Sequence, residues 1–344
     1  MKKYLLVLAC AAILIIAAAV IYLFTGGKTP AIALKGTSKP KVITTIFPQY
    51  DFARAVGGDK IELTMLLKPG MESHSYAPTP QDIVNIQNCD LFIYIGGEND
   101  VWADKILDSI DKEHRPQVLK LISCVSPVEE ELAEGMQAEA EDHDHDKEEE
   151  HAHGAEDKDG QDHNHDNEVE YDEHIWTSPR NAEKMTAAIM DKLILIDPQN
   201  RSAYEENAKA YIAELDRLDK DFRQAVSNVQ RHRLIFGNRF PFRYLTDEYG
   251  LKYSAAFPGC AAESEASAAT IAYLINRVKE EKIPVVFHIE MSNEKTADAI
   301  CRETGARKML LHACHNISRE EYESGATYVK LMRKNLENIK EALN

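Results

Sequence analysis

The chain has 344 residues, of which 44% are hydrophobic and 28% are charged, and its formal net charge is −17. This length supplies enough material for about two globular domains, each with a buried core. The charge excludes a nucleic-acid-binding protein, which would need a basic face with interleaved aromatic side chains.

The first 27 residues predict a membrane segment. Lys2-Lys3 precedes an uncharged, apolar run from Tyr4 to Phe24, which is long enough to cross a bilayer as a helix and leaves the rest of the chain outside the cytoplasm. We expect an uncleaved anchor, followed by a tether over residues 28–40. Val7-Leu8-Ala9-Cys10 also resembles a lipobox, so a lipid on Cys10 is the alternative.

From Lys41 onward, short apolar runs alternate with amphipathic stretches, which indicates strands alternating with helices. This alternation predicts an α/β fold with largely parallel sheets that carry helices on both faces. The expected strands are residues 42–46, 61–67, 91–95, 118–122, 234–236, 253–257, 285–289 and 308–311.

Residues 179–232 read as helices. Ser178-Pro179 predicts a helix start, because serine caps a helix and proline fits its first position. After Asp197-Pro198, apolar residues recur at three- and four-residue steps from Tyr204 to about Arg231. This spacing predicts a helix of roughly 45 to 50 Å. We infer that it joins two lobes, residues 41–178 and 233–344.

One stretch differs from the rest of the N-terminal lobe. Between Glu129 and Glu173 there are 21 acidic residues and only two lysines, so this stretch carries the excess charge. High charge and low hydrophobicity predict a disordered loop over about residues 129–170. Its imidazoles and carboxylates suit divalent transition metals, zinc above all. We expect weak metal contacts at His143, His145, His151, His153, His163 and His165.

Four further histidines fall near the carboxyl ends of expected strands, where ligands gather in open α/β sheets. His74 follows the strand that ends at Leu67, and His174 comes just before a helix cap. His288 ends one strand of the second lobe, and His312 follows another. Four imidazoles suffice for a tetrahedral zinc site.

Three motifs resemble the zinc- and manganese-binding proteins that feed ABC importers, and the zinc-uptake (ZnuA-type) branch most of all. They are Pro69-Gly70-x-x-x-His74-x-Tyr76-x-Pro78-x-Pro80, Tyr94-Ile95-Gly96-Gly97 with Trp102, and His174-x-Trp176-x-Ser178-Pro179. The resemblance covers essentially Lys41 to Asn344. It implies two Rossmann-like lobes with parallel sheets, joined by a long rigid helix, with the metal in the cleft between them. It also implies that His74 and His174 are ligands.

The C-terminal lobe departs from that pattern. Where the family has a ligand His or Glu, this chain has Arg239, which cannot ligate a cation. The final family ligand matches His312. Strand alternation would place His288 and Glu290 on one side, so we expect His288 as a ligand. Glu290 would be a ligand or an acceptor for an imidazole N–H. The alternatives left open are His315, Glu263 and Glu265.

The six cysteines fit neither a dense disulfide scaffold nor a zinc ribbon. Cys260 and Cys314 both follow expected strands, and a bridge is permitted outside the cytoplasm, so this is the pair to test for a disulfide.

The resemblance implies capture of a metal without turnover, and its transfer to an ABC importer permease; we expect a monomer. An imidazole-rich site favours Zn(II) over Mn(II), the alternative cargo, which prefers more carboxylate oxygen. Affinity should fall as the histidines protonate below about pH 6. A membrane-anchored zinc hydrolase is a rival interpretation, but the sequence has no His-Glu-x-x-His, nucleophile elbow or Walker loop. We therefore expect no catalytic residue, while an adhesin with the same fold stays open.

Overall fold

The computed structural model describes residues 38–72, 76–132, 136, 170–260 and 266–344. Pro40–Asn344 form one compact unit. Among the described residues, no helix combines the length and the apolar character that a membrane crossing requires. The expected N-terminal anchor, Cys10 and the loop histidines lie outside the described residues.

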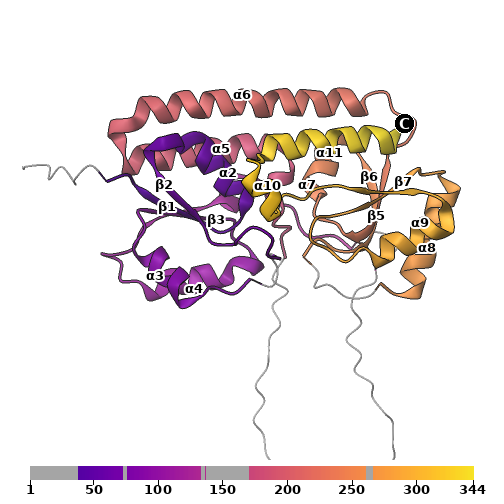
Figure 1. Cartoon of the computed structure of the whole chain (residues 1–344), viewed down its shortest axis with the longest axis horizontal. Coiled ribbons are helices and arrows are strands. Elements are labelled where there is room, and N and C mark those ends of the chain that lie inside the picture. Colours follow the sequence, from indigo (N-terminus) through magenta and orange to yellow (C-terminus); the bar gives the residue numbers. More distant parts are fainter. Residues whose placement is uncertain (1–37, 73–75, 133–135, 137–169, 261–265) are drawn as a thin grey trace, which may run out of the picture. The chain divides into compact units, whose positions relative to one another are not determined.

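Two parallel four-stranded sheets form the centre of this unit (Figure 1). The first has the order β2-β1-β3-β4 and the second the order β6-β5-β7-β8. The apolar runs identified in the sequence form these strands, because both faces of each sheet are covered by helices. The strands are β1 (Lys41–Thr44), β2 (Glu62–Met65), β3 (Leu91–Tyr94), β4 (Gln117–Lys120), β5 (Arg233–Arg239), β6 (Lys252–Phe257), β7 (Val285–His288) and β8 (Arg307–Leu310).

Helices cover both faces of each sheet (Figure 1). On one face lie α2 (Phe47–Gly57) and α5 (Pro179–Ile196) for the first sheet, and α7 (Arg243–Tyr249) and α11 (Tyr328–Leu343) for the second. On the other face lie α3 (Pro80–Gln87), α4 (Val101–Ser109), α8 (Ala268–Glu280) and α9 (Lys295–Thr304). The short helix α10 (Arg319–Glu323) precedes α11.

Helix α6 (Arg201–Val226) runs along both lobes and has 26 residues. At 1.5 Å per residue it is about 39 Å long, which is shorter than the sequence predicts. Pro198–Asn200 form a separate 3₁₀ turn, and the helix ends at Val226 rather than near Arg231. It packs against α2 and α5 of the first lobe and against α7 and α11 of the second.

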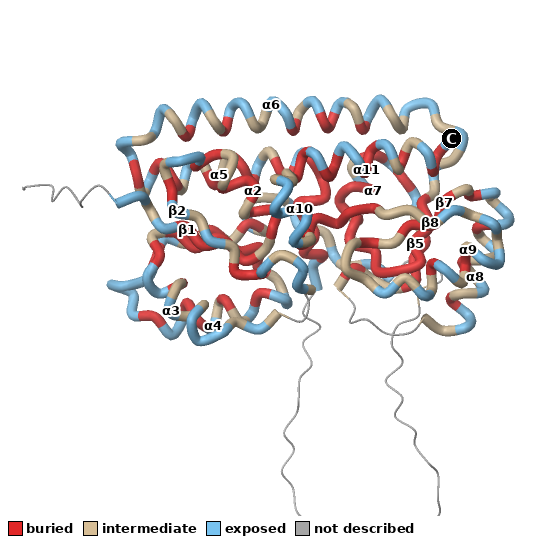
Figure 2. Tube along the Cα trace, in the orientation of Figure 1, coloured by how far each residue is buried: buried red, intermediate tan, exposed pale blue. Residues whose placement is uncertain are grey.

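The largest hydrophobic core is continuous between the two lobes, and it includes Trp176, Phe222 and Tyr328. Smaller cores lie beneath α3 and α4 and beneath α8 and α9. Figure 2 shows that the buried residues are concentrated in the sheets and on the inward sides of the helices. Full burial of a large apolar side chain such as Phe222 stabilises the fold by about 1.5–3 kcal/mol. The shared core therefore ties the lobes together.

The start of α5 fixes the segment that carries His174. Ser178 caps the helix, since its hydroxyl accepts a hydrogen bond from the backbone N–H of Asn181 at 3.3 Å, and Pro179 occupies the first turn. This is the helix start that the sequence predicts. The 3₁₀ turn Ile175–Thr177 fills the interval between His174 and the cap.

Candidate metal centre

His174 is held by a carboxylate two residues earlier in the chain. Its side chain is 1% exposed, and its Nδ1 atom lies 2.8 Å from Oδ1 of Asp172. The same oxygen accepts the backbone N–H of His174 at 2.8 Å. A carboxylate at Nδ1 fixes the proton there, so Nε2 presents the lone pair that a metal requires.

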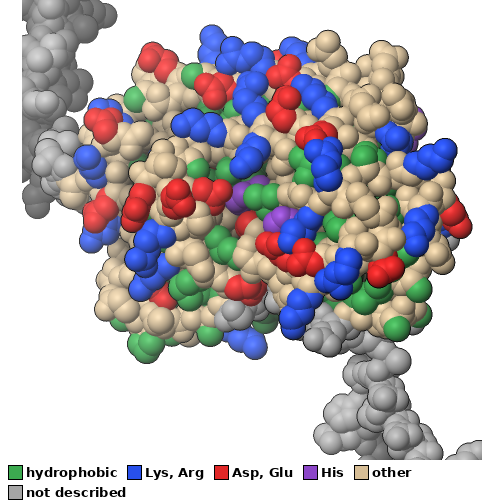
Figure 3. All heavy atoms as spheres, turned by 45° about the vertical axis from the view of Figure 1, so that its right-hand side comes forward, with side chains coloured by type: hydrophobic (Ala, Val, Ile, Leu, Met, Phe, Trp, Pro, Cys, Tyr) green, Lys and Arg blue, Asp and Glu red, His purple; other side chains and the backbone are tan. Residues whose placement is uncertain are grey.

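His315 faces His174. The centroids of the two imidazole rings are 4.6 Å apart and the rings meet at 82°. The Trp176 ring makes T-shaped contacts with both, with ring centroids 5.4 Å from His174 and 5.0 Å from His315. In Figure 3, histidine side chains reach the surface near the middle of the molecule, close to acidic side chains. Two buried imidazoles thus meet where the lobes join.

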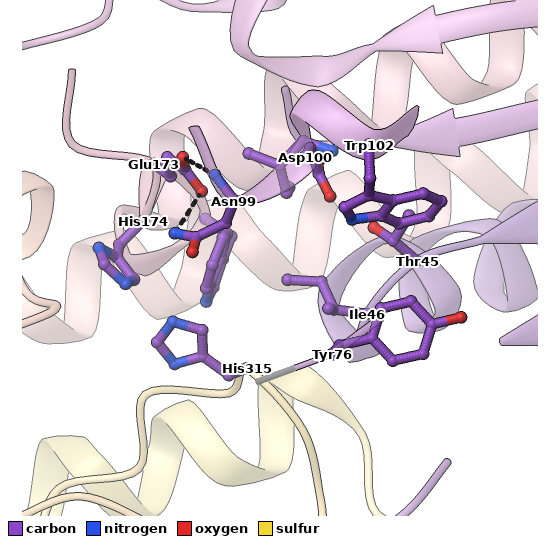
Figure 4. Close-up of a pocket in the computed structure, with 11 residues that line it drawn as sticks. Thr45, Ile46, Tyr76, Asn99, Asp100, Trp102, Glu173, His174 and His315 are labelled. Carbon is purple, nitrogen blue, oxygen red and sulfur yellow. Dashed lines mark hydrogen bonds between the residues drawn. The ribbon is translucent and has the colours of Figure 1, made fainter. Parts of the chain in front are cut away.

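Both rings line a small pocket of about 40 Å³. The first lobe supplies most of its wall, and Tyr76 and Trp102 lie at the end away from the two histidines (Figure 4). The other lining residues are Thr45, Ile46, Ile95, Asn99, Asp100, Glu173 and Trp176.

Acidic groups of the pocket wall are held by hydrogen bonds from the loop after β3. Glu173 accepts the backbone N–H of Asn99 at 2.8 Å and its side-chain amide at 3.0 Å. Burial raises the pKa of Glu173 to about 6, and the two Asn99 hydrogen bonds oppose that rise. Burial also raises the pKa of Asp100, whose carboxylate accepts the backbone N–H groups of Ile95 and Gly96.

Glu290 organises the backbone that carries His315. Its Oε2 atom accepts the backbone N–H of Ala313 at 2.7 Å, and its Oε1 atom accepts that of His315 at 3.1 Å. The Ala313 carbonyl in turn accepts Nε1–H of Trp176 at 2.7 Å. Cys314, which lies between Ala313 and His315 in the sequence, has a left-handed backbone conformation with φ of 63°.

His312, the expected C-terminal ligand, lies elsewhere. It is 3% exposed, and Asn335 bonds both its backbone N–H (2.8 Å) and its carbonyl (2.7 Å). The backbone N–H of Cys314 is 3.0 Å from its Nδ1 atom, and the carboxylates of Glu290 and Glu321 flank the ring at 3.6 and 3.7 Å. The structure thus places His315, not His312, beside His174.

His288 and Glu290 contact different parts of the chain, and the strand that carries His288 does not continue to Glu290. β7 ends at His288, and Met291 turns the chain with φ of 52°. The His288 Nδ1 atom lies 3.5 Å from Oε1 of Glu294, while Glu290 binds backbone N–H groups. Neither lines the pocket with His174, although Glu290 lines a second cavity with His315.

Cys260 and Cys314 are both free thiols in this structure, so the expected disulfide is not formed. Their surroundings differ, and burial raises the pKa of both. Cys314 is buried beside His312, whereas the Sγ atom of Cys260 lies with carboxylate oxygens of Glu130 and Glu170, all within 4.8 Å of one another.

His74, the other expected ligand of the first lobe, lies outside the described residues, as do Glu263, Glu265 and the loop histidines. Its described neighbours are Glu72 and Tyr76, and Tyr76 lines the pocket. The loop after β6 also approaches the site. A Cβ atom at Gly259 would lie 2.9 Å from Cε1 of His174, so this close approach needs glycine.

The family model for the zinc-uptake complex component A, periplasmic (ZnuA), matches residues 42–342. The chain belongs to this family. It is 33% identical over 305 residues to the high-affinity zinc uptake system protein ZnuA of Bacillus subtilis, covering 89% of this chain and 88% of that protein. It is 30% identical to the zinc-binding lipoprotein AdcA of Streptococcus pneumoniae, covering 88% of this chain but only 56% of AdcA. The chain thus spans little more than half of AdcA.

Solved ZnuA-like structures show the same fold. The Zn(II)-bound ZnuA-like domain of Streptococcus pneumoniae AdcA superimposes with a TM-score of 0.69 at 27% identity, covering 89% of this chain and 99% of that domain. The metal-dependent lipoprotein YcdH of Bacillus subtilis gives 0.69 at 29% identity, with the same coverage. The predicted family and the two-lobed α/β fold are confirmed. The relatives are named as zinc-uptake and zinc-binding proteins, in agreement with the expected binding protein.

Proposed function

We propose that this ZnuA-family protein captures Zn(II) outside the cytoplasm and delivers it to the permease of an ABC importer. The observation that carries the proposal is the pair of buried imidazoles, His174 and His315, which face each other at 4.6 Å. His174 also has the carboxylate partner at Nδ1 that is typical of metal-bound histidine. His74, near the pocket residue Tyr76, would add a third imidazole.

The ligand set favours zinc as the cargo. Three imidazoles suit a borderline-soft cation, whereas Mn(II) prefers a larger share of oxygen ligands. Mn(II) is therefore the weaker alternative. The names of the AdcA and ZnuA relatives, which describe zinc binding and zinc uptake, support the same choice.

The histidine- and acid-rich stretch acts in this proposal as an auxiliary collector with weak, exchangeable sites. A monomer is held at the membrane by the N-terminal apolar segment or by a lipid on Cys10. The relative AdcA is a zinc-binding lipoprotein by name, which supports attachment to the membrane.

Titration calorimetry of the full chain and of a variant lacking residues 137–169 tests whether tight binding belongs to the pocket and weak binding to the histidine- and acid-rich stretch. The full chain should bind one Zn(II) tightly and several weakly, with Mn(II) bound more weakly at the tight site. The deletion should remove the weak binding and leave the tight event at a one-to-one ratio. Loss of the tight event on deletion would place the main site in the loop and overturn the proposal.

A further inference from the structure

Two short segments of the first lobe, around Glu130 and Glu170, are paired with each other. Glu129 and Tyr171 form an antiparallel bridge, and the backbone N–H of Glu130 donates to the carbonyl of Glu170 at 2.9 Å. Residues directly opposite each other in such a pair project their side chains to the same side. The pairing therefore places the carboxylates of Glu130 and Glu170 next to each other.

This arrangement of the two carboxylates is electrostatically unfavourable, because like charges directly opposite each other destabilise a strand pair. Partial burial and the charge of Glu130 together raise the pKa of Glu170. Arg243, at the start of α7, is ion-paired with Glu131 and Asp247. A cation bound between Glu130 and Glu170 would relieve their repulsion.

A third segment brings a thiol to the same place. Cys260 follows β6 in the second lobe, is partly buried and is a free thiol. Its backbone N–H donates to Oε1 of Glu130 at 2.9 Å. Its Sγ atom and one carboxylate oxygen each from Glu130 and Glu170 all lie within 4.8 Å of one another. Ligand atoms of one tetrahedral ion lie about 3.3–3.8 Å apart, so small side-chain rotations would complete the set.

The thiol decides which cation suits this cluster. Thiolate sulfur is a soft ligand, and the exposed carboxylate of Glu170 leaves the cluster open to ions from solvent. Burial raises the pKa of the Cys260 thiol, and the charge of Glu130 raises it further. A metal must displace the thiol proton, so Zn(II) would bind here only weakly at neutral pH. A softer ion such as Cd(II) forms a stronger bond to sulfur.

We propose that Cys260, Glu130 and Glu170 form a second cation site, separate from the pocket of His174 and His315, for a thiophilic divalent ion such as Cd(II). On binding, the S–H bond breaks, the proton passes to water, and the sulfur electron pair forms the bond to the ion. No oxidation state changes. The two carboxylates supply oxygen ligands and balance the charge of the ion, and water completes its coordination.

The test titrates the full chain, first loaded with one equivalent of Zn(II), with Cd(II). The ultraviolet charge-transfer band of a cadmium–thiolate bond reports binding at sulfur, and metal analysis reports whether zinc is retained. In wild type the band should appear while zinc stays bound. Cys260→Ser should abolish the band. Glu130→Gln and Glu170→Gln should each weaken the binding that the band reports by at least about 10-fold.

Cys301→Ser and Glu129→Gln are the matched controls. Cys301 is another partly buried thiol, in α9, and Glu129 is the neighbour of Glu130 on the opposite side of the paired segment. Both variants should give the wild-type band and affinity. Urea unfolding of each metal-free variant detects misfolding, and Glu170→Gln, at an exposed position, tests the site even if Cys260→Ser does not fold.

Three outcomes would overturn the inference. A wild-type chain without the band, or a band that persists in Cys260→Ser, would show that this thiol is not a ligand. Release of zinc in proportion to the cadmium added would place Cd(II) in the pocket of His174. Wild-type affinity in both Glu130→Gln and Glu170→Gln would leave a single reactive thiol rather than a site built from three segments.

Discussion

His174 and His315 meet in one pocket, but the two lobes hold them in different ways. The ring of His174 is bonded directly by the carboxylate of Asp172, two residues away. His315 is placed through its backbone, since Glu290 accepts its N–H and Phe47 donates to its carbonyl at 3.1 Å. The ring of His174 is oriented by a residue close to it in sequence, whereas His315 is positioned by the path of its loop.

The position of His174 is thus set by contacts that are local in sequence, and the position of His315 by long-range contacts. The Asp172–His174 pair depends on a short segment next to a capped helix. The position of His315 depends on residues of both lobes and on the left-handed turn at Cys314. Substitutions on the two sides should therefore differ in which property they change.

The largest effect is expected from His315→Ala. Removing a metal ligand should weaken zinc binding by more than about 100-fold, beyond the range for outer partners, while the metal-free fold changes little. Competition titration with a chelator measures this loss.

His312→Gln is the matched comparison, three residues away. Its side chain is buried and flanked by Glu290 and Glu321, so it should lower the free energy of unfolding while zinc affinity stays within about threefold. If His312→Gln lost zinc binding and His315→Ala kept it, the assignment of the two histidines would have to be exchanged.

A smaller effect is expected from Asp172→Asn. The amide can still accept the backbone N–H of His174, but it no longer offers a negative charge to the ring. Zinc affinity should fall by about 10–100-fold through lower ligand basicity. Zinc titrations of this variant and of the control Glu320→Gln, which changes an exposed acidic residue, measure this loss of affinity. An unchanged affinity would mean that Asp172 serves the backbone alone.

The smallest effect concerns Glu173, whose side chain is 7% exposed. Its pKa is raised from 4.5 to about 6 by burial, so the folded state binds this proton more tightly than the unfolded state does. The ionised carboxylate therefore costs stability as the pH rises from about 4.5 to about 6, and the full cost is about 2 kcal/mol above that range.

Urea unfolding of the metal-free protein in the presence of a chelator measures this pH dependence. Wild type should lose about 2 kcal/mol relative to Glu173→Gln between about pH 4.5 and about pH 7. Parallel curves for the two proteins would show that the carboxylate is not shifted by burial, and that this side of the pocket is formed without electrostatic cost.

The strands of both sheets could be predicted from the sequence, but the end of the long helix could not. Continuous apolar runs such as Leu91–Tyr94 have few alternatives to a buried parallel strand. The long helix stops at Val226 although apolar residues continue at helical spacing as far as Val229. Periodicity marks a face that can be buried, whereas the end of a helix depends on what is there to bury it.

The candidate site could be predicted where it is local. His174 is found from its motif, and the acid two residues earlier was the available signal for Asp172. The second lobe was harder, because β7 ends at His288 and turns at Met291, which breaks the alternation that paired His288 with Glu290. Left-handed backbone at Met291 and Cys314 has no sequence signal comparable to glycine, so His315 could be kept only as an alternative.

Helix α6 has a consequence for how long a metal stays bound. It packs along helices of both lobes. A hinge motion between the lobes would therefore bend this continuous helix or expose its apolar side chains, which are buried in the shared core. Moving the loop that carries His315 would cost less free energy than bending the helix, because Glu290 and Asn316 hold that loop with only a few hydrogen bonds. Residence time would then be set by these bonds, and a receiving protein could shorten it by competing for them.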